Sequence, residues 1–489
     1  MYFLYLLLTI ALAVPASTAS DATVGLRLAF EPATLDWTMG DVPIHVINNV
    51  VEGLYGVNQA GLLEPVEAQG LPRRVGTTAA WRVSLRTDLK WSDGKPVRAA
   101  DYMAAWSRLL APKTASTYAY LLFDFEGARE FNAGKSTVWN GARAVGDHEI
   151  EMVLRERKAD HFPTAALSHW ATFPVRADLV TTFSDWGSEP SHMVFNGPYK
   201  ILSYKHATKL ELIPNSLHRT PGTLKKIEAL IVEDDATALR LYESGRLHFM
   251  ADLGTLDRAV LAKRDDLHSM KSPVLVYLGI DSRNSALAEK KYRQALSLAI
   301  DRTLFQPLLG PGYVPASGLT PELNLLRAAD PGEARRLSGE PRLQRPEFGF
   351  FEKGSNKMIA EFIQAQWKKN LGLDANIKGA EIKSYWKRLA RDPFAIFLNT
   401  YGPPVGDTRY YFELLKTGNP MNLGRWSNAD YDQAVEKGDI ATASRILDEE
   451  TPIIPLYFRA YDYLVNPHLK GAVLNPMTSL FLKDAQLLQ

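Results

Sequence analysis

The chain has 489 residues, more than a single hydrophobic core usually contains, so we expect two or three domains. Apolar residues make up 46% and charged residues 23%, and the net charge of +1 excludes bulk electrostatic binding to nucleic acid or to an anionic membrane. The sequence contains no cysteine, which excludes disulfides, thiolate metal sites, cysteine nucleophiles and a lipid anchor on an N-terminal cysteine.

The start of the chain has the pattern of a secretory signal peptide. Residues 2–14 are almost wholly apolar, but this run is shorter than the about 20 residues that span a bilayer. Small residues follow at 16–20, as in the window that signal peptidases cleave. No basic residue precedes the apolar run, and a buried N-terminal helix is the alternative interpretation. We predict that residues 1–20 are a signal peptide and that the mature protein is free in the periplasm, not membrane-anchored.

The stretch from Trp91 to Leu122 predicts a turn, a helix and a loop rich in hydroxyl groups. Ser-Asp-Gly at 92–94 is a turn signal. Apolar residues then recur at helical spacing, and Pro112 ends the predicted helix. The residues of this apolar face are Tyr102, Ala105, Trp106, Leu109 and Leu110. The loop that follows carries threonine, serine and Tyr118, with no catalytic pattern among them.

Three later stretches predict β-structure. In residues 197–215, two runs with partial alternation flank a polar Lys-His-Ala-Thr, which predicts a β-hairpin. The short apolar runs 274–281 and 452–458 predict buried strands that are far apart in the sequence. Strands therefore alternate irregularly with helices, which favours an α/β fold.

Two further apolar faces predict helices, and one segment predicts a surface connection. Tyr292, Leu296, Ala299 and Ile300 mark one helix. Residues 359–367 form the face of another, with Gly372 as its C-terminal stop. Residues 323–347 are polar and rich in proline and glycine, and we expect a surface connection there.

A search for catalytic patterns finds none. The ten histidines are scattered, without the His-x-x-x-His spacing of a zinc hydrolase, and no Gly-x-Ser-x-Gly nucleophile turn occurs. Gly-Lys-Ser-Thr at 134–137 looks like the end of a phosphate loop, but Arg129 stands where such a loop needs glycine. We therefore expect no enzyme activity, no cofactor and no metal. The 10 Trp and 20 Tyr are residues that line binding clefts, although they more often pack in cores.

Several stretches in order resemble the bacterial extracellular solute-binding proteins of family 5, the oligopeptide- and dipeptide-binding proteins of ABC importers. The similarity spans roughly residues 24 to 475. The matching stretches are TLDW (34–37), NNVVEGL (48–54), WSDGKPVRAADYMAAWSRLLAPKTAS (91–116), NGPYKILSY with LIPN (196–215), ALRLYESGRLHFM (238–250), YRQALSLAIDR (292–302), QAQWKKNLGL (364–373) and PIIPLYFRAYDYLVNPHLKG (452–471).

This resemblance implies a fold of the periplasmic-binding-protein type II-like class, with two lobes around a hinge and a third, inserted domain. The two predicted strands near 275 and 457 lie where the family's crossing strands are expected. On this basis we place lobe I at 21–51, 176–274 and 466–489, the insert domain at 52–175 and lobe II at 275–465.

The resemblance also implies a function without chemistry. Such a protein closes its two lobes over a peptide or other small-molecule ligand and delivers it to the permease subunits of an ABC transporter. We expect a monomer that acts in this way on peptides or peptide-like solutes. Two alternatives remain open: a sensory or cell-envelope interaction protein on the same fold, and a receptor for a non-peptide solute.

The resemblance implies ligand-binding positions, but the sequence departs from the family at the most important one. Peptide binders hold the ligand ammonium with an aspartate in a Gly-Trp-x-x-Asp segment, and here that position falls on Pro403 or Pro404. The nearby Asp407 has two interpretations: it caps a helix that begins at Thr408, or it reaches the ligand amine. The predicted ligand-binding residues are Trp37, Asp41, Tyr118, Asp252, Asn399, Tyr401 and Asp407.

The arginines that meet the ligand's C-terminus in oligopeptide binders also lack clear counterparts. One of their positions falls on Leu398. Arg388 and Arg391 lie nearby, and we expect both to be solvated. The family's contacts with a peptide are therefore incomplete at both ends, and a bound amine would be held by Asp407 or by another acid such as Asp41 or Asp252.

Overall fold

The computed structural model describes residues 23–488, apart from 40–41, 59–60, 156–161, 252, 255, 257, 311, 340–344 and 420. The expected signal peptide and the candidate ligand residues Asp41 and Asp252 lie outside the described residues. Within the described part, no helix combines the length and the apolar character that crossing a membrane requires.

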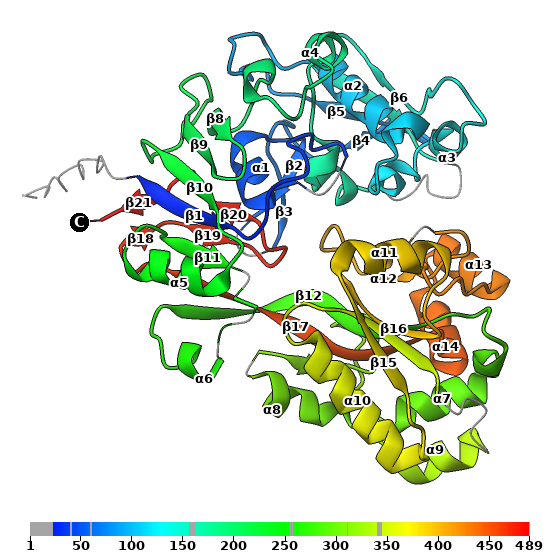
Figure 1. Cartoon of the computed structure of the whole chain (residues 1–489). Coiled ribbons are helices and arrows are strands. Elements are labelled where there is room, and N and C mark those ends of the chain that lie inside the picture. The colour runs from blue at the N-terminus through cyan, green and yellow to red at the C-terminus, as the bar shows by residue number, and fades with distance from the viewer. Residues whose placement is uncertain are drawn as a thin grey trace, which may run out of the picture.

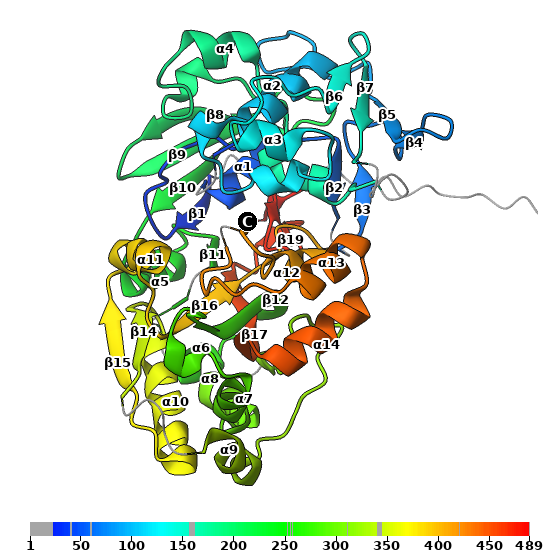
Figure 2. The same cartoon turned by 90° about the vertical axis from the view of Figure 1, so that its right-hand side faces the viewer.

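The chain forms two lobes joined by two long strands (Figures 1 and 2). The upper lobe of Figure 1 holds the blue-to-green N-terminal half and the red C-terminal strands. The lower lobe holds the green-to-orange segment between them. The strands β12 (Leu267–Ile280) and β17 (Ile453–Val465) run from one lobe to the other. The predicted α/β class with two lobes is confirmed, and each crossing strand is longer than the apolar run that predicted it.

The β12–β17 pair is interrupted between the lobes. Residues 267–271 pair with 460–464, and residues 275–279 pair with 453–458, with a register shift between the two blocks. Pro273 lies in the interruption and has no N–H to give to the ladder. One hydrogen-bonded path of strands, β15-β14-β16-β12-β17-β11-β1-β10-β9-β8, therefore runs through both lobes, but only because they share this interrupted pair.

The upper lobe contains the first strands, the predicted hairpin and the C-terminal strands. β1 pairs parallel to β10, and β8 pairs antiparallel to β9, which confirms the hairpin. The bounds are β1 (Val24–Leu28), α1 (Ile44–Val50), β2 (Tyr55–Val57), β3 (Leu63–Pro65), α4 (Ala177–Thr182), β8 (Tyr199–Lys205), β9 (Lys209–Pro214), β10 (Ile227–Ile231), α5 (Asp235–Glu243), β11 (Phe249–Ala251), α6 (Arg258–Leu261), β18 (Leu469–Lys470), β19 (Val473–Leu474), β20 (Leu480–Phe481) and β21 (Gln486–Leu487).

A separate antiparallel sheet with the order β4-β5-β7-β6 lies at the top of this lobe (Figure 1). Its elements are β4 (Arg73–Arg74), β5 (Ala80–Ser84), α2 (Ala99–Leu110), α3 (Ala128–Asn132), β6 (Ala142–Ala144) and β7 (Glu149–Val153). Helix α2 buries the apolar face that the sequence predicts, and the Trp106 indole donates to the Thr172 carbonyl at 2.8 Å. These buried residues share one hydrophobic cluster with β1 and α1, so the two parts have a common core.

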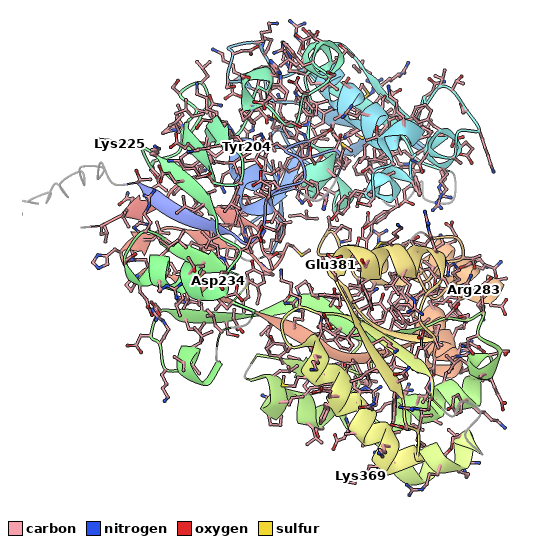
Figure 3. The ribbon with its side chains drawn as sticks, viewed as in Figure 1. Tyr204, Lys225, Asp234, Arg283, Lys369 and Glu381 are labelled. Carbon is pink, nitrogen blue, oxygen red and sulfur yellow. The ribbon has the colours of Figure 1, made fainter. Side chains whose placement is uncertain are left out.

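The lower lobe packs helices on the other half of the sheet. Its bounds are α7 (Lys290–Leu298), α8 (Phe305–Leu309), β13 (Val314–Pro315), α9 (Pro331–Ser338), β14 (Glu347–Phe351), α10 (Asn356–Leu371), β15 (Asn376–Ala380), α11 (Ile382–Arg391), β16 (Ile396–Tyr401), α12 (Arg409–Glu413), α13 (Ala429–Lys437) and α14 (Ile440–Glu450). The two predicted helices are present, and Gly372 ends α10 in a left-handed conformation, with φ of 69°. Figure 3 shows side chains filling both lobes, with Lys225 and Lys369 on the outside.

The described residues of the predicted surface connection at 323–347 are mostly exposed, and its middle part forms a helix that the composition did not indicate. Residues 331–338 form α9. The Asp330 carboxylate accepts the Glu333 N–H at 2.9 Å, and Pro331 occupies the first turn, where its missing N–H costs nothing. Asp330 and Pro331 are thus a helix N-terminal signal within a segment whose composition is typical of a loop. The residue boundaries predicted for the two lobes and the insert domain stay a prediction.

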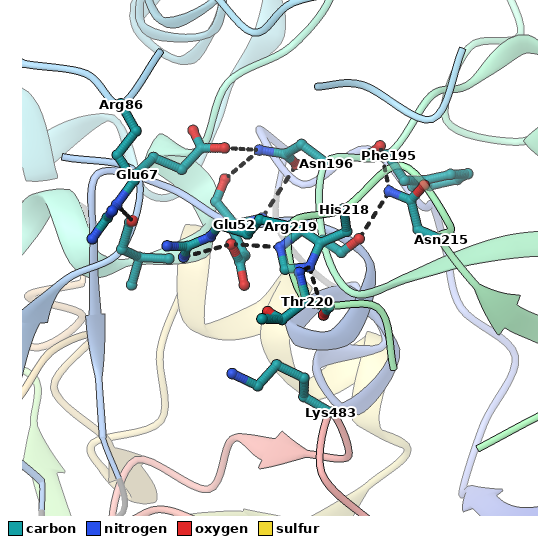
Figure 4. A network of polar contacts seen from close by, with 12 residues as sticks. Glu52, Glu67, Arg86, Phe195, Asn196, Asn215, His218, Arg219, Thr220 and Lys483 are labelled. Carbon is teal, nitrogen blue, oxygen red and sulfur yellow. Dashed lines mark hydrogen bonds and ion pairs between the residues drawn. The ribbon is translucent and has the colours of Figure 1, made fainter. Parts of the chain in front are cut away.

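A buried carboxyl group joins the upper sheet layer to the rest of the upper lobe (Figure 4). Glu67 is 1% exposed and accepts hydrogen bonds from the Tyr102 hydroxyl and from Asn196 Nδ2, the latter at 2.9 Å. The same Asn196 amide binds both backbone groups of Glu52, at 2.9 and 3.2 Å. Burial raises the pKa of Glu67 to about 8, so the group is mostly protonated at neutral pH.

We expect Glu67→Gln to change how stability depends on pH. The folded-state pKa is about 8 against 4.5 for the free group, so the native protein holds a proton that the unfolded chain loses between these values. The wild-type free energy of unfolding should therefore fall, relative to the variant, as pH rises from about 4.5 to about 8. Urea denaturation at pH 5 and pH 8 measures this, with Glu64→Gln on exposed β3 as the control. Parallel pH profiles for wild type and Glu67→Gln would contradict the prediction.

Candidate functional site

A cavity of about 490 Å³ lies between the upper lobe and one loop of the lower lobe. Most of its wall comes from α1 and the residues after it, from Tyr118 and residues 168–173, and from the C-terminal strands. The lower lobe contributes the loop 402–405, directly after β16. Segments that are far apart in the sequence therefore meet at this cavity. Of the predicted ligand-binding residues, Tyr118 lines it.

Aromatic rings form one side of the cavity. The ring centroids of Tyr118 and His169 lie 4.6 Å apart, those of Tyr118 and Trp170 lie 5.0 Å apart, and those of His169 and Trp170 lie 4.4 Å apart. Phe173 extends this wall. Such a surface favours flat or apolar groups of a ligand.

His169 supplies a neutral polar group within the aromatic wall. Its Nδ1 accepts the Ala171 N–H at 3.2 Å, which places the ring proton on Nε2. Burial lowers the pKa of His169 to about 3, so the ring is uncharged at neutral pH. No hydrogen bond among the described residues uses Nε2, and this atom is not one of the fully buried ones. The wall therefore presents an N–H donor without a charge.

The lower lobe contributes the loop 402–405 to the cavity wall. Pro403 and Pro404 have no backbone N–H and no polar side-chain atom. Residues 402–405 therefore add neither a charged side chain nor a side-chain donor to the wall.

The charged residues of the cavity wall have partners within the protein (Figure 4). Glu52 lies 3.1 Å from His218 Nε2 and 3.6 Å from the Arg219 guanidinium. Lys483 lies 3.9 Å from Asp484, and Figure 4 shows it apart from the Glu52 pairs. The Glu52 carboxylate thus lies within ion-pair distance of the Arg219 guanidinium, whereas Lys483 and Asp484 form a long, exposed pair.

Asp407 is held by Arg409. The guanidinium contacts both carboxylate oxygens of Asp407, with Nε at 3.1 Å from each and Nη2 at 2.5 Å from Oδ2. Asp407 Oδ1 also accepts the Arg409 backbone N–H at 3.0 Å, a turn of the Asx type just before α12, whose N-cap Thr408 makes no side-chain cap hydrogen bond. Both carboxylate oxygens of Asp407 are therefore hydrogen-bonded to Arg409.

Three other predicted ligand residues lie in the core and do not line the cavity. Trp37 is fully buried against Trp186, and its indole donates to the Phe173 carbonyl at 3.3 Å. Asn399 donates to the Tyr277 hydroxyl at 2.8 Å, and the Tyr401 hydroxyl donates to the Tyr410 carbonyl at 2.8 Å. In this structure their role is to fix the ends of β16 and neighbouring segments, because their polar atoms are used inside the protein.

The two arginines near α11 also lie away from the cavity. Arg388 is paired with Glu347 at 2.5 Å and stacks on the Phe394 ring at 3.6 Å, while Arg391 is exposed. Among the described residues, no group of acids and histidines is arranged as a metal site.

Sequence reasoning missed most of the cavity wall. His169 and Trp170 were visible only as an aromatic pair, Arg219 and Lys483 as ordinary surface charges, and Asn48 as part of a matched stretch. No spacing rule connects them, because they meet only through the packing of α1, the aromatic segment and the C-terminal strands.

The two lobes touch beside the cavity. The Tyr120 ring lies 6.2 Å from the Tyr410 ring, and Arg155 lies 3.4 Å from Glu436 of α13 and 3.4 Å from Asp124. Arg155 and Tyr120 belong to the upper lobe, whereas Tyr410 and Glu436 belong to the lower one. The structure therefore represents a closed arrangement of the lobes.

Comparison with known proteins agrees with this geometry. The chain is 26% identical to the Periplasmic murein peptide-binding protein MppA of Escherichia coli (strain K12), over 91% of this chain and 89% of that protein. It is 25% identical to the Probable deoxycholate-binding periplasmic protein YgiS of the same organism, over 93% of this chain and 91% of YgiS.

Two solved structures of MppA have the same fold as this chain. The murein tripeptide-binding protein MppA superposes with a TM-score of 0.84 at 25% identity, covering 97% of this chain and 99% of that one. The Unliganded Open Form of MppA, at 24% identity over 95% of this chain and 97% of that one, gives a TM-score of 0.72.

Residues 76–423 match the profile of the Bacterial extracellular solute-binding proteins, family 5 Middle, which is more than half of the chain. The order of the matching sequence stretches, the two lobes and the shared cavity all agree with this match. The chain belongs to the bacterial extracellular solute-binding proteins of family 5.

Proposed function

We propose that this protein is a receptor that captures a peptide or peptide-like solute between its lobes and delivers it to the permease subunits of an ABC importer. The observation that carries the proposal is the cavity of about 490 Å³ walled by both lobes. Opening the β12–β17 hinge would remove the 402–405 wall and release the ligand. The similarity to MppA, a protein named for binding murein peptide, supports this function. The receptor acts as a monomer and makes or breaks no covalent bond.

Export to the periplasm is part of the proposal. The apolar run at 2–14 and the small residues at 16–20 support cleavage of a signal peptide. We expect N-terminal sequencing of protein from an exporting bacterial host to begin between about residues 17 and 21. Mature protein that still carries Met1 would refute this expectation.

The ion pair between Arg155 and Glu436 should favour the closed arrangement. It bridges the lobes, but it is partly exposed, so we expect it to contribute about 1 kcal/mol or less. Arg155→Gln should therefore shift the unliganded protein toward an open form, seen as a larger radius of gyration in small-angle X-ray scattering. Arg445→Gln is the matched control, because its partner Glu449 lies on the same helix. Identical scattering from wild type and Arg155→Gln would contradict the proposed role of this ion pair in favouring the closed arrangement.

The loop of the lower lobe argues against the family's usual grip on a free amino terminus. A buried ammonium needs a carboxylate partner, since an unpaired buried charge is strongly unfavourable. Pro403 and Pro404 supply none, and Asp407 is already paired with Arg409. The same observation favours a second candidate, a receptor for a non-peptide solute, and YgiS is a relative named for such a ligand.

Calorimetry on wild type and Asp407→Asn tests the role of this loop. With a mixed library of di- to pentapeptides with free amines, we expect the substitution to change affinity by less than about twofold, because Arg409 already neutralises the acid. Stability should fall by about 1 kcal/mol or less, since asparagine also caps helices well. Tight binding by the wild type that is lost in Asp407→Asn would identify Asp407 as the ammonium anchor. The N-acetylated library on both proteins is the control.

A further inference from the structure

Two cationic side chains on the cavity wall have N–H donors that the protein does not use. Arg219 lines the cavity, its side chain is 27% exposed, and its guanidinium lies 3.6 Å from Glu52. Lys483 also lines the cavity, with 41% of its side chain exposed, and lies 3.9 Å from Asp484. Both distances are too long for a hydrogen bond, and neither side chain donates one to any described residue. These two residues, the wall cations, can therefore donate to a ligand.

The acids of the same wall are less suited to an ion pair with a ligand amine. Glu64 and Asp484 are exposed, the latter with 79% of its side chain, so water and salt screen their charges. Glu52 is 17% exposed, but its carboxylate already lies 3.1 Å from His218 Nε2 and within ion-pair distance of Arg219. The partly buried charges that lack a hydrogen bond to the described protein are thus the wall cations, which favours an anionic ligand group.

The wall cations both belong to the upper lobe. Arg219 follows β9, and Lys483 follows β20 in the C-terminal segment. The arginines that the family resemblance implies for a ligand carboxylate are expected near α11 and β16 of the lower lobe. There, Leu398 takes one position, and Arg388 is paired with Glu347 away from the cavity. A carboxylate held by the wall cations would therefore bind to the opposite lobe.

Much of the remaining wall suits an apolar body. Tyr118, Trp170 and Phe173 line one side of the cavity, and the rings of Tyr118 and Trp170 lie 5.0 Å apart. Pro403 and Pro404 add apolar rings from the lower lobe. The Trp170 indole N–H is a further donor, because it has no hydrogen bond to a described residue and is not fully buried. A ligand with an apolar body and acceptor oxygens therefore matches both kinds of surface.

We propose that Arg219 and Lys483 form a carboxylate-binding subsite of the cavity, and that the ligand is an amphipathic acid with an apolar body. The two side chains donate to the carboxylate, while the aromatic wall contacts the body, and no free amine is required. An N-acylated apolar peptide with a free C-terminus and a fatty acid share this chemistry. The inference rests on the proposed receptor function and specifies the ligand of the same cavity.

Calorimetry with matched acids and amides provides the test. The peptide probes are N-acetyl-trileucine with a free carboxylate and the same peptide with a C-terminal amide, and the non-peptide probes are octanoate and octanamide. We expect the peptide acid to bind at least about 5-fold more tightly than its amide, because only the acid forms charge-assisted hydrogen bonds with the wall cations. High salt should reduce this preference, since both cations are partly exposed. The same preference for octanoate, without binding of the peptide acid, would identify a non-peptide acid as the ligand.

Two substitutions and a control locate the subsite. Arg219→Gln and Lys483→Met each remove one charge, and each should weaken binding of the acid about 3- to 10-fold and change binding of the amide by less than about twofold. Lys483→Met keeps the backbone carbonyl that Thr223 uses, so its melting temperature should match that of the wild type. Lys205→Met is the matched control, because Lys205 is exposed at the end of β8, outside the cavity wall. It should leave the affinity for the acid unchanged.

The outcomes separate this subsite from the receptor function. Equal affinity for acid and amide in the wild type would overturn the inference, as would a preference for the acid that both Arg219→Gln and Lys483→Met retain. Lys483→Met decides by itself if Arg219→Gln is unstable. Binding of free-amine peptides without binding of either acid would also overturn the subsite, while the receptor function would stand. If neither the acids nor the free-amine peptides bind, the proposed function and the inference fail together.

Discussion

The fold depends on one pair of crossing strands. β12 and β17 carry the hydrogen-bonded path from one lobe to the other, and the interruption between Lys271 and Leu275 removes backbone bonds where the lobes separate. Pro273 at this point cannot donate to the ladder. The pair is thus strong inside each lobe and weak between them, which is the property that a hinge requires. The cavity wall comes from both of the lobes that this strand pair connects.

The upper lobe behaves as one body because its two layers share a hydrophobic core. Helix α2 packs its tryptophan and tyrosine into the same cluster as β1 and α1. The buried Glu67 is hydrogen-bonded to Tyr102 of α2 and to Asn196, and so connects the two layers. The cavity wall on this side therefore moves as a unit. Among the described residues, the lower lobe contributes the short proline-containing loop 402–405 to the cavity. Closure of the lobes therefore completes the cavity wall with side chains that carry no charge.

Charged residues of both signs line the cavity. Arg409 occupies Asp407, and Glu52 is divided between His218 and Arg219. The family relates to the movement of the lobes, whereas these side-chain pairings affect which ligand groups the cavity can bind. Aromatic rings form one side of the cavity, and the loop 402–405 adds no charged side chain to it.

The sequence by itself determined the local elements and the family. The apolar face of α2, the Gly372 stop of α10, the hairpin at 197–215 and both crossing strands follow from spacing and turn chemistry, which act between near neighbours. The loss of the acid at Pro403 and Pro404 was also readable. Tertiary structure decided the rest: Trp37, Asn399 and Tyr401 became core residues, and residues as distant as Asn48, His169 and Pro403 came to line one cavity. Such outcomes depend on contacts between distant segments, and no local pattern records which polar atoms those contacts will use and which they will leave free.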